Sequence, residues 1–185
     1  MSLTNPATYL LSFPVTSPFG FRPQFGDFHT GIDLGIAMWR PLPALRDGVI
    51  VLDDDDGLYD PAILATYAGI SVRLRADDGE EWWYAHLSEN LVTAGQSVRL
   101  GDIIGYCGST GASTGPHLHL ERIIAGVAID PLGRLKELGD YISRPEFEAY
   151  QQNVKETLDA IKAAYDPIAS KYYTHSHDTT APKPI

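Results

Sequence analysis

The sequence predicts a mainly β fold, in which an antiparallel β core is followed by a C-terminal amphipathic α-helix. Two observations predict the β core: short runs in which apolar and polar residues alternate, and clusters of Gly, Pro and Asp between them. A third observation predicts the helix, because apolar residues recur at helical spacing after residue 143.

The predicted strands are four short runs in the first two thirds of the chain, at residues 48–52, 70–75, 81–87 and 117–121. Turn signals bound several of them, as at Asp56-Gly57 and Asp77-Asp78-Gly79. Because signals of this kind join neighbouring strands through tight turns, we expect mostly antiparallel pairing.

The predicted helix begins near Ser143, which lies three residues before Glu146 as in a capping box, with Pro145 in the first turn. Its apolar stripe follows spacings of three and four residues and consists of Phe147, Tyr150, Val154, Leu158, Ile161 and Tyr165. The stripe is short for a coiled coil, so packing against the chain's own sheet is the favoured interpretation. Docking of a partner protein on the same stripe is a second hypothesis.

The chain has 185 residues, which suits one domain with an appendage. We expect a β-rich domain over 1–139 with an acidic insertion at about 53–67, a helical extension over 140–168 and a flexible tail over 169–185. The acidic segment begins with four aspartates, which are expected to form a solvated acidic turn.

Composition excludes several classes of protein. The formal net charge of −10 disfavours binding to nucleic acid and to anionic membranes. The single Cys107 cannot form an intrachain disulfide, and no apolar run is long enough for a transmembrane helix. Because the N-terminus lacks the basic and apolar segments of a secretory signal, we expect delivery by another route.

Histidines and one aspartate predict a metal site. His117 and His119 are two residues apart on a strand, so they project from the same face, and they suit one metal ligand and one acid–base group. His29 and Asp33 can reach one ion if Gly31 lets the backbone turn tightly. Two imidazoles and one carboxylate suit Zn²⁺ and leave a fourth position open for water, as in catalytic zinc sites.

Histidines are the candidates for the acid–base groups of such a site. The sequence has no His-Glu-x-x-His motif, so the glutamate base of helical zinc proteases is missing. His86 and His117 could act as general base and stabilise the oxyanion instead. Glu121 would share the strand face of His117 and His119 and could orient a histidine, although an exposed salt bridge is an equally good interpretation.

Four segments resemble, in the same order, the lysostaphin/LytM-type zinc metallopeptidases of peptidase family M23: residues 17–22, 29–33, 84–88 and 108–119. The resemblance spans about residues 14–133. It implies an antiparallel β core with a groove across it, one Zn²⁺ per chain bound by His29, Asp33 and His119, and a catalytic pair formed by His86 and His117. The implied activity is endopeptidase cleavage of peptide cross-links in bacterial peptidoglycan.

The implied location is the bacterial cell wall, outside the cytoplasm. Without a signal peptide, carriage on a phage particle or release at lysis is the expected route, with a virion or tail protein bound to the C-terminal helix as a hypothesis. The alternatives are a non-catalytic virion or wall-binding module that keeps the fold, and a hydrolase of another small peptide or amide.

Three further expectations concern short segments of the chain. Trp82 and Tyr84 share strand parity with His86 and could line the groove with it, whereas Trp83 would face the core. The run from Gly105 to Gly115 is interpreted as a groove wall and not a phosphate loop, because no Gly-Lys-Ser/Thr follows. The tail pair His175 and His177 is expected to bind metal only fortuitously.

Overall fold

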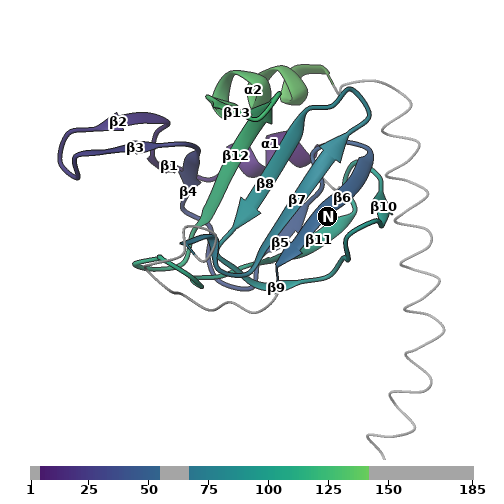
Figure 1. Cartoon of the computed structure of the whole chain (residues 1–185), viewed down its shortest axis with the longest axis horizontal. Coiled ribbons are helices and arrows are strands. Elements are labelled where there is room, and N and C mark those ends of the chain that lie inside the picture. The colour runs from purple at the N-terminus through teal and green to yellow at the C-terminus, as the bar shows by residue number, and fades with distance from the viewer. Residues whose placement is uncertain (1–4, 55–66, 142–185) are drawn as a thin grey trace, which may run out of the picture. The chain divides into compact units, whose positions relative to one another are not determined.

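The strands of the computed structural model, which describes residues 5–54 and 67–141, are mostly short and antiparallel (Figure 1). They are β1 (Val15–Ser17), β2 (Gly20–Arg22), β3 (Asp27–His29), β4 (Ile32–Leu34), β5 (Pro41–Pro43), β6 (Gly48–Asp54), β7 (Ser71–Ala76), β8 (Glu81–Ala85), β9 (Leu87–Asn90), β10 (Ser97–Val98), β11 (Ile103–Cys107), β12 (Leu118–Ile124) and β13 (Val127–Ile129). The helices are α1 (Pro6–Leu11) and α2 (Pro131–Tyr141). The predicted mainly antiparallel β class is confirmed.

The main sheet has the strand order β1-β4-β12-β8-β7-β6-β10, and β13 pairs with β12. A second sheet has the order β5-β11-β9, and β2 and β3 form a separate hairpin that projects from the main sheet in Figure 1. The order places β4, β12 and β8 side by side although they lie far apart in the chain. This arrangement brings the predicted site residues together.

The core contains apolar side chains from both of the larger sheets. Alternation along the main strands directs Leu118 and Leu120 of β12 into it, and Leu42 and Ile104 come from the second sheet. The fully buried Tyr84 joins the two layers, because its hydroxyl donates to the Pro43 carbonyl (3.2 Å) and accepts from the Leu45 N–H (3.1 Å).

Two helices that the sequence did not predict lie next to each other, at opposite ends of the described chain. Asn5 caps α1, because its side-chain oxygen accepts from the Ala7 N–H at 2.8 Å. Its side-chain nitrogen donates to the Leu138 carbonyl (3.0 Å) and the Gly139 carbonyl (3.2 Å) at the end of α2. One side chain thus holds the start of one helix against the end of the other.

The helical extension predicted over 140–168 lies outside the described residues except for residues 140 and 141, which belong to α2. The tail over 169–185 and most of the acidic insertion also lie outside them. Asp53 and Asp54, expected in the insertion, belong to β6 and pair with Val72 and Ser71 of β7. These two residues therefore extend the main sheet. The domain boundaries stay a prediction.

The prediction for the three aromatic residues of β8 is wrong. Trp82 and Tyr84 are fully buried, and Trp83 is half-buried under the Arg73 guanidinium, which lies 4.4 Å from the centre of its ring. Strand parity failed because β8 ends at Ala85 and His86 has a φ of 62°, outside the extended region. His86 therefore does not continue the alternation of Trp82 and Tyr84.

Among the described helices, none combines the length and the apolar character needed to cross a membrane.

Candidate metal centre

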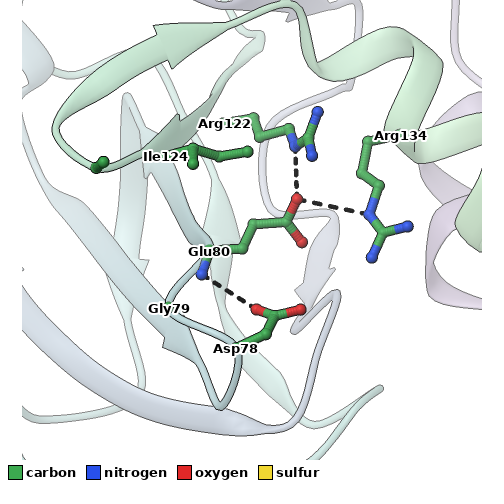
Figure 2. A pocket seen from close by; sticks show the side chains of 7 residues that line it. Asp78, Gly79, Glu80, Arg122, Ile124 and Arg134 are labelled. Carbon is green, nitrogen blue, oxygen red and sulfur yellow. Dashed lines mark hydrogen bonds and ion pairs between the residues drawn. The ribbon is translucent and has the colours of Figure 1, made fainter.

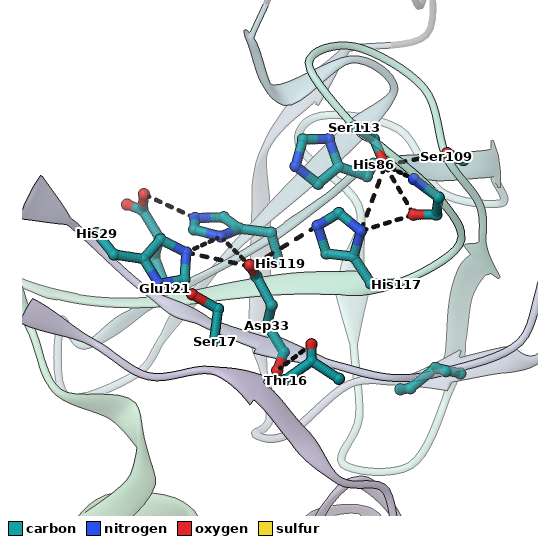
Figure 3. A network of polar contacts seen from close by, with 12 residues as sticks. Thr16, Ser17, His29, Asp33, His86, Ser109, Ser113, His117, His119 and Glu121 are labelled. Atoms are coloured by element: carbon teal, nitrogen blue, oxygen red, sulfur yellow. Dashed lines mark hydrogen bonds and ion pairs between the residues drawn. The ribbon is translucent and has the colours of Figure 1, made fainter. Parts of the chain in front are cut away.

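Neighbouring strands bring the five predicted site residues together (Figure 3). Asp33 of β4 lies directly opposite His119 of β12, and His119 in turn pairs with Ala85 at the end of β8. His29 is the last residue of β3, and His86 follows Ala85 directly. His117 precedes β12 and forms an isolated bridge with Gly108.

His29, Asp33 and His119 form a compact triangle of possible ligand atoms. His29 Nε2 lies 3.1 Å from Asp33 Oδ1 and 3.0 Å from His119 Nδ1, and His119 Nδ1 lies 2.9 Å from Asp33 Oδ1. Donor atoms about 2.1 Å from a tetrahedral ion lie roughly 3.4 Å apart, so a small outward movement would make room for one ion. The three residues could hold a metal ion.

The outer nitrogens of both ligand histidines have fixed partners. His29 Nδ1 donates to the Pro18 carbonyl at 2.9 Å, and His119 Nε2 donates to Glu121 Oε1 at 3.1 Å. Because a carbonyl and a carboxylate oxygen only accept, the proton of each neutral imidazole is on its outer nitrogen. Each inner nitrogen then directs a lone pair toward Asp33 Oδ1, and three acceptors that converge in this way suit a cation.

The electrostatics favour a positive charge at the same point. Burial lowers the pKa of His119, but hydrogen bonds to Asp33 and Glu121 outweigh burial and raise this pKa to about 9. Burial raises the pKa of Asp33, but its contacts with His119 and His29 hold it well below its usual range. Without a metal ion the positive charge is a proton on His119, which a metal ion has to displace.

The sequence predicted that Gly31 lets the backbone turn tightly, and the structure shows that the absence of a side chain there permits a close approach. Its φ is not positive, but a Cβ atom there would lie 2.5 Å from the Leu120 carbonyl oxygen and 2.9 Å from His119 Cε1. The missing side chain lets the segment after β3 lie directly against β12.

Glu121 makes the contact that would orient His119. It is 8% exposed, accepts from His119 Nε2, and also accepts a hydrogen bond from the Thr30 hydroxyl. The interpretation of Glu121 as an orienting residue therefore fits the geometry better than an exposed salt bridge does. The role of Thr30 carried no signal in the sequence.

His86 and His117 form a second pair beside the triangle. Their ring centres lie 4.7 Å apart, and His117 Nε2 lies 3.7 Å from Asp33 Oδ1. His86 Nδ1 donates to the Thr110 carbonyl and His117 Nδ1 to the Gly115 carbonyl, each at 2.8 Å. In the neutral form both Nε2 atoms are therefore unprotonated and free to accept a proton.

Burial, followed by the neighbouring His117, lowers the pKa of His86 to about 4, so this imidazole is neutral at neutral pH. The left-handed backbone of His86 is fixed by its N–H, which donates to the Ala68 carbonyl at 2.8 Å. Strained backbone of this kind is common at functional positions.

The wall predicted between Gly105 and Gly115 comprises the end of β11 and a bonded loop. The Thr110 hydroxyl donates to the Leu87 carbonyl (2.7 Å) and accepts from the Ile70 N–H (3.0 Å). The Ser113 hydroxyl lies 3.3 Å from His117 Nδ1. Sequence reasoning missed these supports because most of them are backbone carbonyls, which no residue type indicates.

A separate pocket of about 480 Å³ lies at the far end of β12 and contains none of these histidines (Figure 2). The buried Glu80 carboxylate there lies 2.5 Å from Arg122 Nε, 2.8 Å from Arg46 and 3.5 Å from Arg134 of α2. Asp78 and Glu137 bind two of the same guanidinium groups, Arg46 at 2.7 Å and Arg134 at 3.1 Å, so the three positive charges are balanced. The network connects α2 to the sheet, and a structural role explains the pocket.

Relatives of the chain are peptidases. It is 40% identical over 122 residues to the DD-carboxypeptidase/endopeptidase Mpg of Neisseria meningitidis, covering 64% of this chain and 26% of that protein. It is 30% identical over 140 residues to the peptidoglycan DD-endopeptidase ShyA of Vibrio cholerae, covering 76% and 30%. The chain thus spans between a quarter and a third of the length of these relatives.

Solved structures share the fold. The catalytic domain of the antimicrobial peptidase lysostaphin from Staphylococcus simulans matches with a TM-score of 0.62 and 32% identity, covering 71% of this chain and 98% of that domain. A zinc-containing peptidase from Vibrio cholerae matches with a TM-score of 0.56 and 28% identity, covering 65% and 36%. The model of peptidase family M23 matches residues 27–131, which include all five clustered residues, and the chain belongs to this family.

Proposed function

We propose that this chain is a zinc-dependent endopeptidase that hydrolyses peptide cross-links of bacterial peptidoglycan. His29, Asp33 and His119 bind one Zn²⁺, and His86 and His117 act on the substrate and the attacking water. The observation that carries the proposal is the convergence of three acceptor atoms, two of them on imidazoles whose outer protons are held by Pro18 and Glu121.

The donor set fits zinc. Two imidazole nitrogens and one carboxylate oxygen are common zinc ligands, and three protein ligands leave one position for water. When bound, the ion would lower the pKa of that water and polarise the scissile carbonyl. The zinc-containing peptidase of Vibrio cholerae supports the choice of this metal.

The histidine pair supplies the proton transfer. The Nε2 atoms of His86 and His117 carry lone pairs, because the Thr110 and Gly115 carbonyls hold the protons on Nδ1. One imidazole accepts the proton of the attacking water and returns it to the leaving amine. The other takes up a proton at Nε2 from solvent before the reaction, donates a hydrogen bond from it to the developing oxyanion, and keeps it.

The substrate class rests on the relatives. ShyA of Vibrio cholerae is named a peptidoglycan DD-endopeptidase, and lysostaphin is named an antimicrobial peptidase. The protein would accordingly act on the cell wall, outside the cytoplasm. Carriage on a phage particle and a virion partner at the helical extension stay predictions, because residues 142–185 are not described.

The test is digestion of purified peptidoglycan by the full zinc-loaded chain, with released fragments identified by mass spectrometry. New amino termini are expected from the wild type, and His117→Ala should lower their rate of formation by at least 100-fold. Binding without fragments would support the non-catalytic alternative. Cleavage of other amides alone would support the third interpretation.

A double variant, His175→Ala with His177→Ala, is the matched control. It removes the only other His-x-His pair of the sequence, and the expected result is an unchanged rate of cleavage. Loss of cleavage in this variant with full activity in His117→Ala would contradict the assignment.

A further inference from the structure

Trp39 is an exposed aromatic residue in a backbone conformation that tryptophan rarely adopts. Its φ is 65° and it is 58% exposed. The Arg40 N–H donates to the Ala37 carbonyl at 3.3 Å, so Trp39 is the third residue of a tight turn. Positive φ at that position normally requires Gly or Asn, and a bulky side chain there is strained.

Two other described residues besides glycine have a positive φ, and each has a local explanation for it. His86 belongs to the histidine pair of the site. Ala125 lies beside Gly126 in the tight turn between β12 and β13 and carries only a methyl group. Trp39 has the same strained backbone together with a large exposed ring, so packing in the core does not compensate the strain. Strained residues of this kind are common where a ligand is bound.

Trp39 has an aromatic neighbour. The ring centres of Trp39 and Tyr106 lie 6.3 Å apart at an interplanar angle of 55°, within the range for interacting aromatic pairs. Tyr106 is half-buried, so its ring supports the exposed indole from the side of β11. The two residues form a small aromatic platform on the surface.

The platform is linked to the histidine site through the backbone. The Trp39 N–H donates to the Cys107 carbonyl at 2.8 Å, and the next residue, Gly108, accepts from the His117 N–H at 3.2 Å. The end of β11 therefore contacts the backbone of Trp39 through Cys107 and the backbone of His117 through Gly108. A polymer chain attached to a peptide in the site could reach the platform.

We propose that Trp39, supported by Tyr106, binds a sugar ring of the glycan strand to which the cleaved peptide is attached. This inference rests on the proposed function, because peptidoglycan is a glycan polymer cross-linked by peptides. Sugar rings present C–H groups on their flat faces, which pack on aromatic faces while the hydroxyls stay in water. An uncharged ring also avoids the repulsion that a protein of net charge −10 exerts on anions.

The first test is titration of the full chain with glycan strands from which the peptides have been removed and whose freed carboxyl groups have been converted to amides, so that the strand is uncharged. Binding is followed by tryptophan fluorescence. Trp39 is the exposed tryptophan, since Trp82 is fully buried and Trp83 half-buried. A saturable change in emission is expected for the wild type and for the control Val127→Ala, an exposed apolar residue on β13. Because Trp39→Gly removes the reporter itself, its binding is measured by calorimetry, with at least a fivefold loss of affinity expected.

Trp39→Gly also separates binding from structure. Because glycine adopts positive φ freely, the variant should unfold at a temperature no lower than the wild type. Its cleavage rate on intact peptidoglycan, relative to that on a soluble cross-link peptide without sugars, should fall at least fivefold.

Three results would overturn the inference: no response of the wild type to glycan strands, equal affinity of Trp39→Gly, or an equal loss of rate on both substrates. If the wild type cleaves neither substrate, the proposed function fails, and the glycan titration still decides this inference by itself.

Discussion

At the scale of single residues, the site depends on groups that hold the five clustered side chains in position. The Pro18, Thr110 and Gly115 carbonyls and the Glu121 carboxylate each accept from the outer nitrogen of one histidine. These contacts fix the tautomer of each of the four clustered imidazoles in its neutral form, and with it the direction of the free lone pair.

Glu121 should therefore affect metal affinity without being a ligand. We expect Glu121→Ala to weaken zinc binding by about 10- to 100-fold, because His119 loses the acceptor that orients it. Glu121→Gln keeps an acceptor and should lose less. Competition with a chromogenic chelator measures both, and equal affinity of the alanine variant and the wild type would rule out an orienting role.

Gly31 is predicted to tolerate no side chain. In Gly31→Ala, the new Cβ would lie 2.5 Å from the Leu120 carbonyl oxygen, so β12 has to move and His119 with it. We expect at least a tenfold loss of zinc affinity and a loss of about 1–3 kcal/mol in the free energy of unfolding.

Gly133→Ala in α2 is the matched control, because nothing lies within 4 Å of its added Cβ. It should leave zinc affinity unchanged and raise stability by about 0.5–1 kcal/mol. If Gly31→Ala binds zinc as tightly as this control, the site does not depend on the close approach of Gly31 to β12.

Cys107 is predicted to be inert in the folded protein. It is 1% exposed, its thiol donates to the Ile36 carbonyl at 3.3 Å, and burial raises its pKa to about 11. Since only the thiolate reacts, iodoacetamide at pH 8 should modify the native protein far more slowly than the protein in urea. Equal rates would show that the thiol is accessible.

At the scale of elements, Asn5 connects the two described helices. Asn5→Ala should lower the free energy of unfolding by about 1–2 kcal/mol, because it removes the cap of α1 and the bonds to the end of α2. Asn5→Asp keeps the capping oxygen and loses only the donor nitrogen, so a smaller loss is expected. Urea denaturation compares the two, and an equal loss would assign the whole effect to the contact with α2.

The elements also indicate how far the sequence could predict this structure. Alternation located β6, β7, β8 and β12 and placed Leu118 and Leu120 in the core, because period-two burial acts locally. It failed at Trp82 and Tyr84, because a change of backbone conformation at His86 cannot be seen in a pattern of side chains. Neither short α1 nor α2 was predicted, since their packing depends on contacts between the two ends of the domain.

At the scale of the whole molecule, the fold brings distant segments to one point. Residues 29–33, 86 and 117–119 meet because β4, β12 and β8 are neighbours in the main sheet. The motifs predicted which residues would assemble, and the structure places all five together. The sequence could not predict the register that sets His119 opposite Asp33, because register depends on pairing between distant strands.

The central claim is that His29, Asp33 and His119 share one zinc ion. Its most direct test is a crystal structure of the zinc-loaded protein with anomalous diffraction at the zinc edge. We predict one peak in the main domain, with His29 Nε2, Asp33 Oδ1 and His119 Nδ1 about 2.0–2.2 Å away. A peak bound by His86 and His117 without Asp33, or no peak near these residues, would contradict the account.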